Sequence, residues 1–205
     1  MLPYLLLATS YAFAAAVQPG PFQAFLIAQT ITNGWRKTVP AVFAPLLSDI
    51  PIVCLVLLVL TQVPPLFVNL LRLAGGVYLL YLAYGALKTF RTYGRPDAAP
   101  PAAVSQTIFK AALVNLLNPN PYLGWALVMG PLLLRAWQEN PSYAIALVVL
   151  FYAVMILSTA VILALFAGAR SFGQRIARGL VGFSAAALLC FGLYQLWLGT
   201  TALTS

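Results

Sequence analysis

Two short proline motifs interrupt apolar segments of the kind that forms membrane helices. Residues 18–22 read QPGPF, and residues 118–122 read NPNPY. Proline has no N–H and clashes with the carbonyl four residues before it, so each motif leaves backbone carbonyls without helical partners. In a bilayer such groups must find other partners or line a wet cavity. The carbonyls expected to be freed are those of Ala15, Val17, Asn115 and Leu117.

The same motifs have the chemistry to bind a small zwitterion. Each break is predicted to start a new half-helix at its second proline, whose N–H groups point back towards the break with a partial positive charge. Two such ends facing each other suit a carboxylate, while freed carbonyls and side-chain amides suit an ammonium. The alternative for either motif alone is a structural kink. The candidate substrate-binding residues are Gln18, Pro19, Gly20, Pro21, Asn118, Pro119, Asn120, Pro121 and Tyr122.

Asp49 is the third candidate, because it is an acidic residue near the middle of an apolar segment. A charge at that depth costs at least ~2.5–3.5 kcal/mol on insertion scales. No Lys or Arg lies close to it in the sequence, so the carboxyl is expected to be protonated part of the time. Asp49 is therefore a candidate proton carrier or ammonium partner. The alternative is a neutral acid that hydrogen-bonds to freed carbonyls.

The elements that position these residues follow from the composition. Of the 205 residues, 62% are hydrophobic and 7% are charged, whereas a soluble domain carries about 25% charged residues. The chain is therefore predicted to be an all-α integral membrane protein. A helix needs about 20 apolar residues to cross roughly 30 Å of hydrocarbon, and six segments qualify. They are approximately residues 3–30, 39–62, 66–88, 108–134, 142–167 and 177–198.

The six predicted spans divide into two related halves. Residues 1–90 form the first three-helix repeat, residues 91–106 a proline-rich cytoplasmic linker, and residues 107–205 the second repeat. An odd number of spans per half inverts the second half with respect to the first, as in many transporters. The two proline motifs match in type at an offset of 100 residues, and Arg72–Gly76 resembles Arg178–Gly182 at an offset of 106. The glycines among them are expected to allow close helix packing.

The basic residues predict the orientation of the chain. Nine of the eleven Lys and Arg fall in three of the predicted connections, and only Arg72 and Arg135 lie on the other side. The positive-inside rule places those three connections in the cytoplasm and both termini outside. The nine residues are Arg36, Lys37, Lys88, Arg91, Arg95, Lys110, Arg170, Arg175 and Arg178.

Several other functions find no support in the residues present. The net charge is +8, and the basic residues lie between apolar segments and form no basic blocks with interleaved aromatics. They therefore indicate the orientation of the chain in the membrane and contacts with anionic lipid, and not nucleic-acid binding. There is no histidine, and Cys54 and Cys190 form no C-x-x-C motif. With one acid in the spans, no catalytic constellation, metal site or cofactor site is expected.

The combination of motifs resembles the LysE/RhtB family of amino-acid exporters, within the wider LysE-type superfamily. The motifs that carry the resemblance are AVQPGPFQAF, the stretch between Gly34 and Asp49, LLRLAGGVYLLYLAYGALK and LVNLLNPNPYLGW. The chain departs from the family pattern after Asn118-Pro119, where many relatives carry a lysine. The resemblance implies six spans and proton-driven efflux of amino acids or related small metabolites across the bacterial cytoplasmic membrane.

The sequence therefore predicts a secondary-active exporter, an antiporter with alternating access around a midplane site. Its expected partners are a small-molecule substrate, protons and the lipid bilayer, and a homodimer would suit so small a unit. The alternative is a passive channel, or an inorganic-ion or metal transporter of the same superfamily. Metal transport has fewer ligands available, because one acid in the spans and no histidine leave few donors.

Overall fold

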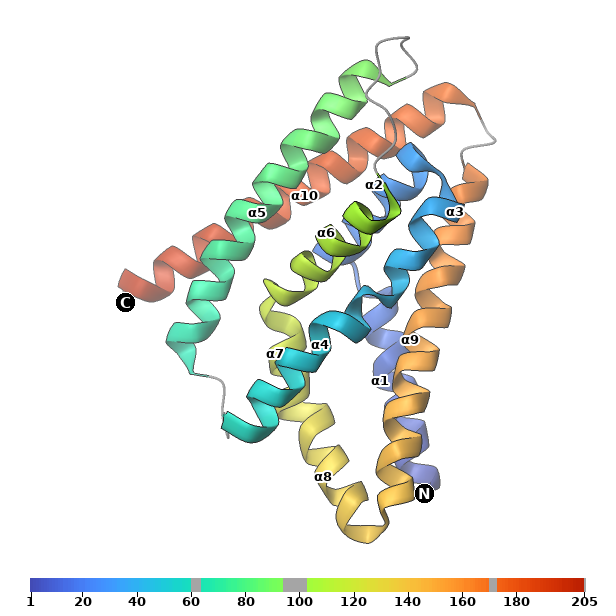
Figure 1. Cartoon of the computed structure of the whole chain (residues 1–205). Coiled ribbons are helices and arrows are strands. Elements are labelled where there is room, and N and C mark those ends of the chain that lie inside the picture. Colours follow the sequence, from blue (N-terminus) through green and yellow to red (C-terminus); the bar gives the residue numbers. More distant parts are fainter. Residues whose placement is uncertain (60–63, 94–102, 170–172, 205) are drawn as a thin grey trace.

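The computed structural model describes residues 1–59, 64–93, 103–169 and 173–204, and these residues fold into helices without any strand (Figure 1). The first half contains α1 (Leu2–Val17), α2 (Pro21–Asn33), α3 (Trp35–Thr38), the 3-10 segment η1 (Val39–Phe43), α4 (Ala44–Cys54), the π-helical η2 (Leu55–Val59) and α5 (Pro65–Thr92). The second half contains α6 (Val104–Leu116), α7 (Pro119–Gly124), the π-helical η3 (Trp125–Met129), α8 (Gly130–Glu139), α9 (Pro141–Ala169) and α10 (Gln174–Thr204).

Four segments of the described chain are long and apolar enough to cross a membrane. They are Trp35–Leu57, Pro65–Thr92, Pro141–Gly168 and Gln174–Ala202, and α1 is a shorter apolar helix. The fold is therefore that of an all-helical membrane protein. The predicted linker falls mostly on residues 94–102, which lie outside the described residues, as do Arg95 and Arg170.

The helices around the two proline motifs begin and end at defined residues. α1 ends at Val17 and α2 begins at Pro21, whereas α6 ends at Leu116 and α7 begins at Pro119. The second half-helix thus starts at the first proline of its motif, and the prediction that it starts at Pro121 is wrong. The reason is local, since the Asn118 side chain accepts a hydrogen bond from the backbone N–H of Asn120 and so caps the helix. Proline is well tolerated at the position that follows a cap.

A single residue, Gly34, connects α2 to the next helix. Its φ of 89° lies in the region that favours glycine, so the chain turns sharply there. Arg36 and Lys37 were predicted in a loop, but they lie in α3 directly after this turn. The turn is tighter than the sequence suggested because glycine reverses the chain without needing a longer connection.

The last helix of each half packs against the other along its length (Figure 1). Gly76 of α5 and Gly192 of α10 meet at this contact, where an added Cβ at Gly76 would lie 2.9 Å from the Gly192 carbonyl oxygen. An added Cβ at Gly75 would lie 2.6 Å from the Leu117 carbonyl oxygen, beside the second proline motif. Small residues allow this close approach of backbones, as the sequence predicted.

The other helices pair across the two halves. α1 packs along α9, and α6 packs against α4. A buried cluster of side chains lies between these pairs and includes Ile52, Trp125 and Phe151. The helices that flank the proline motifs are therefore held by helices of the opposite half.

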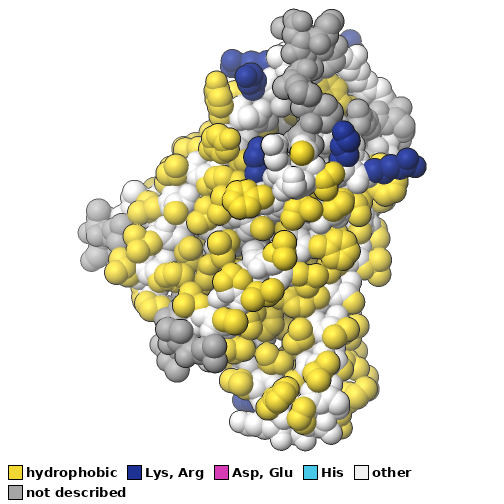
Figure 2. All heavy atoms as spheres, viewed as in Figure 1, with side chains coloured by type: hydrophobic (Ala, Val, Ile, Leu, Met, Phe, Trp, Pro, Cys, Tyr) yellow, Lys and Arg dark blue, Asp and Glu magenta, His cyan; other side chains and the backbone are white. Residues whose placement is uncertain are grey.

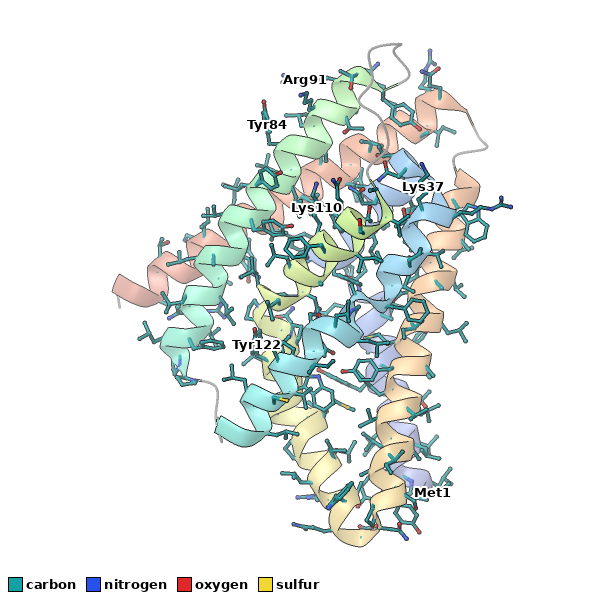
Figure 3. All side chains as sticks on the ribbon, viewed as in Figure 1. Met1, Lys37, Tyr84, Arg91, Lys110 and Tyr122 are labelled. Carbon is teal, nitrogen blue, oxygen red and sulfur yellow. The ribbon has the colours of Figure 1, made fainter. Side chains whose placement is uncertain are left out.

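Basic side chains gather at one end of the molecule. Figure 2 shows most of the visible Lys and Arg at the upper end of this face, above a broad hydrophobic surface. Figure 3 places Lys37, Arg91 and Lys110 towards that end and Met1 at the opposite end. The charge distribution thus distinguishes the two ends of the helical body.

The close contact between α5 and α10 predicts that a larger side chain at Gly76 lowers the stability of the protein. Gly76→Ala is expected to lower the unfolding temperature, because the new methyl group meets a backbone oxygen that cannot move aside and overpacking costs about 1–3 kcal/mol. For a chain of this size each kcal/mol corresponds to about 2–4 °C. Gly85→Ala on the same helix is the control, since nothing lies within 4 Å of its added Cβ. Thermal unfolding in detergent measures both, and an equal shift in the two variants would contradict the assignment of the contact.

Candidate functional site

A pocket of about 130 Å³ lies where the two proline motifs meet. Its wall takes residues from both halves of the chain. Gln18, Gly20 and Asp49 come from the first half, and Asn118 and Thr159 come from the second. Segments separated by about a hundred residues in the sequence therefore share one cavity in the centre of the helical body.

At the first break, a side chain that follows the motif hydrogen-bonds to backbone carbonyls at the end of α1. Gln23, on the first turn of α2, donates its amide N–H to the carbonyls of Ala15 and Ala16 at 3.3 and 3.1 Å. The Ala15 carbonyl was predicted to be freed, and the structure shows how it is satisfied. Gly20 precedes α2 in an extended conformation, with φ −163°. The helix N-terminus at Pro21 thus opens onto the pocket while the preceding carbonyls bond elsewhere.

The second break satisfies its backbone with other groups. The Tyr122 hydroxyl donates to the Leu116 carbonyl at 2.9 Å, and the Asn118 N–H donates to the Asn115 carbonyl at 3.2 Å. The Leu117 carbonyl instead packs against Gly75 of α5. Tyr122, labelled in Figure 3, lies in the middle of the molecule. This break is therefore stabilised from within its own helix and by a helix of the other half.

Asp49 lies on α4 with only 4% of its surface exposed. Its Oδ1 accepts a hydrogen bond from the Asn115 amide at 2.8 Å, and its Oδ2 accepts one from the Tyr152 hydroxyl at 3.0 Å. The Asn115 amide also donates to the Ser48 hydroxyl at 2.8 Å. The Trp125 side chain also hydrogen-bonds to the carboxyl. All three partners come from the second half, so Asp49 ties α4 to α6, η3 and α9.

Most of the predicted binding residues line this pocket, and two do not. Pro119 is buried at the start of α7, and Tyr122 is turned towards Leu116 and stacks edge-on against Phe67 at 5.3 Å. Both contribute to the break but not to the pocket wall. The predicted residues on the wall are Gln18, Pro19, Gly20, Pro21, Asp49, Asn118, Asn120 and Pro121.

Several residues at the site were not predicted. Asn115 lies one helical turn before the second break. Its own backbone carbonyl was one of those expected to be freed, and this was the signal in the sequence that could have identified it. Gln23 directly follows the first motif and repeats the amide at Gln18. Tyr152 had no local signal, because it lies in an unbroken apolar segment and reaches Asp49 only through the packing of α9 on the core.

An aromatic group separates the pocket from a groove on the outer surface of α1 and α8. Tyr11 lines the pocket and also lines the groove, together with Ser10, Leu132 and Arg135. Its ring stacks on Phe151 with the centroids 6.2 Å apart. The hydroxyl lies over Gly124, where an added Cβ would clash with it. Gly124 therefore provides the space that Tyr11 occupies.

A body of apolar helices around a pocket lined by both polar and apolar residues defines a multi-pass membrane protein. The family model described as LysE type translocator matches residues 13–199, which is nearly the whole chain. The chain therefore belongs to the LysE type translocator family and is a membrane transport protein, and the resemblance drawn from its motifs is confirmed. A search of the curated proteins finds no match, and neither does a search of the solved structures.

The contact between Tyr11 and Gly124 predicts a non-additive pair of substitutions. Gly124→Ala alone is expected to destabilise the protein by about 1–3 kcal/mol, because its methyl group meets the tyrosine hydroxyl. In a Tyr11→Phe background the same substitution is expected to cost much less, since the hydroxyl is gone. A double-mutant cycle of unfolding temperatures in detergent measures the difference. Additive effects would show that the two residues do not constrain each other.

Proposed function

We propose that the protein is a secondary-active exporter of amino acids or related small zwitterionic metabolites. The observation that carries this proposal is the convergence of both proline motifs and Asp49 on one pocket. The N-terminus of α2 offers partial positive charge to a substrate carboxylate, and α7 adds the positive end of its helix dipole, since Pro119 and Pro121 have no N–H and the Asn120 N–H is bonded to the Asn118 side chain. Asp49, with the amides of Gln18 and Asn120, offers partners to the substrate ammonium.

The architecture proposed for this function is a pair of inverted three-helix repeats, residues 1–90 and 107–205, joined by a linker at residues 91–106. Reciprocal contacts support it. Gly182 stands 106 residues after Gly76, and Leu196 stands 106 residues after Phe90. An added Cβ at Gly76 would meet Leu196, and one at Gly182 would meet Phe90, so the two halves exchange equivalent contacts. The helix pairs show the same reciprocity: α1 of the first half packs on α9 of the second, and α6 of the second half packs on α4 of the first.

Inverted repeats around a central site suit alternating access, in which one half rocks against the other. Asp49 is placed to couple that motion to a proton, because its carboxyl joins α4 of the first half to Asn115 and Tyr152 of the second. Protonation would take a charge and an acceptor away from this link. The proton would enter from the outside and the substrate would be released to that same side, in alternation, as in an antiport.

The described residues bring together no group of three His, Cys, Asp or Glu side chains. No observation therefore favours the metal-transport alternative over an organic substrate. The pocket wall combines the Asp49 carboxyl with the partial positive charge of a helix N-terminus, which suits a zwitterion better than a single inorganic ion.

The proton-coupling role is tested with Asp49→Asn in proteoliposomes. A coupling of ordinary strength means that an imposed proton gradient accelerates substrate transport by the wild type about 5–150-fold. The Asp49→Asn variant is expected to lose most of this acceleration. Glu139→Gln is the matched control, because Glu139 lies at the end of α8 and bonds to Tyr4 outside the pocket. Wild-type rate and wild-type pH dependence in Asp49→Asn would remove Asp49 from the coupling mechanism.

The proposed orientation places both termini outside and the basic end in the cytoplasm of a bacterial inner membrane. Single cysteines test it in a background that lacks Cys54 and Cys190. A membrane-impermeant maleimide is expected to label Leu2→Cys in right-side-out vesicles, and Lys37→Cys only after the vesicles are permeabilised. The opposite pattern would reverse the orientation without changing the fold.

A further inference from the structure

We propose that the pocket selects a small amino acid with an uncharged side chain, and that Met155 limits the size of that side chain. The inference rests on the proposed transport function and adds the substrate class to it. Three features of the pocket carry it: the charges on its wall, the apolar side of that wall, and its volume.

The charges exclude substrates that carry a charged side chain. Asp49 is the one charged residue among the described residues that line the pocket. It can pair with the ammonium on the α-carbon of a substrate, but a second ammonium, as in lysine, would find no second carboxylate. An additional carboxylate, as in glutamate, would find no Lys or Arg on the described wall. An unpaired charge beside a carboxyl that is only 4% exposed is strongly disfavoured.

The apolar side of the wall provides the place for a side chain. It is formed by Trp125, Met129, Phe151 and Met155, of which Trp125 also hydrogen-bonds to Asp49. Trp125 and Phe151 pack edge to face with their ring centroids 6.0 Å apart, and both are buried. Met129 is fully buried in the same cluster. These residues are fixed by their neighbours, so the wall cannot widen at their positions without disturbing the core.

Met155 differs from the rest of this wall. It is only partly buried, and it packs against the cluster from its edge. Its unbranched thioether adapts to the space available and tolerates substitution. It lies one helical turn before Thr159, another residue on the pocket wall. Shortening Met155 therefore enlarges the apolar side of the pocket while the polar side keeps its groups.

The volume sets the limit on side-chain size. The pocket of about 130 Å³ is slightly smaller than the roughly 150 Å³ apolar cavity that holds one benzene molecule. It therefore has room for alanine or valine. Phenylalanine adds a complete phenyl ring to the alanine skeleton and does not fit beside the bound carboxylate and ammonium.

Counterflow in proteoliposomes tests the inference. Vesicles containing the wild-type protein are loaded in turn with alanine, valine, phenylalanine, lysine or glutamate, and exchange with the same radiolabelled amino acid is measured. Alanine and valine are expected to exchange, and the other three to exchange at least about tenfold more slowly, within the range that pocket contacts provide. In Met155→Ala the ratio of phenylalanine to alanine exchange is expected to rise about tenfold, while lysine and glutamate stay slow.

Leu157→Ala is the matched control, because Leu157 lies on the same helix with its side chain 66% exposed on the outer surface. It is expected to keep the wild-type ratio, and unfolding temperatures verify that both variants are folded. Lysine or glutamate exchange as fast as that of alanine would overturn the charge selection and leave the transport function standing. An unchanged ratio in folded Met155→Ala would overturn the role of Met155. No exchange of any of the five by the wild type would overturn the proposed function, and the inference with it.

Discussion

The structure depends on one constraint, which is that a backbone group freed inside a bilayer must find its partner within the protein. The two breaks meet this constraint in different ways. At the first break, the Gln23 amide donates hydrogen bonds to two carbonyls of α1. At the second, the Tyr122 hydroxyl serves the end of α6, and the Asn118 side chain caps α7. These hydrogen bonds occupy carbonyls on the side of each break that faces away from the new half-helix, so that the N-terminus of that half-helix can face the pocket.

This difference makes a chemically asymmetric site out of two similar motifs. Asp49 has no acidic counterpart at the equivalent place in α9, where Met155 and Thr159 reach the pocket instead. One half therefore supplies the carboxyl, and the other supplies its hydrogen-bond donors, Asn115 and Tyr152. A site built in this way has both polar and apolar residues on its wall, and the Asp49 carboxyl joins the two halves through its hydrogen bonds. The close crossing of α5 and α10 at Gly76 and Gly192 gives the two halves a shared support.

Much of this was available from the sequence, because it follows from properties of single residues. The helical fold follows from apolar segments with few charges. The place of each break follows from proline, which lacks an N–H wherever it stands. The choice of Asp49 as a candidate follows from the cost of a carboxyl in an apolar segment. The start of the second half-helix was predicted two residues too late, because the Asn118 cap outweighed the symmetry of the two motifs.

Only the tertiary structure decided which side chains contact Asp49, Gly124 and the backbone of the two breaks. Tyr152 lies more than a hundred residues from Asp49 in the sequence and reaches it only because α9 packs against the core. Tyr11 lies over Gly124 for the same kind of reason, and Tyr122 turns from the pocket to a carbonyl of its own break. The sequence by itself determined that the chain is a membrane protein, where its helices break and which residue carries the unusual charge. The partners of those groups depend on distances between segments remote in the chain, and packing of the whole molecule sets those distances.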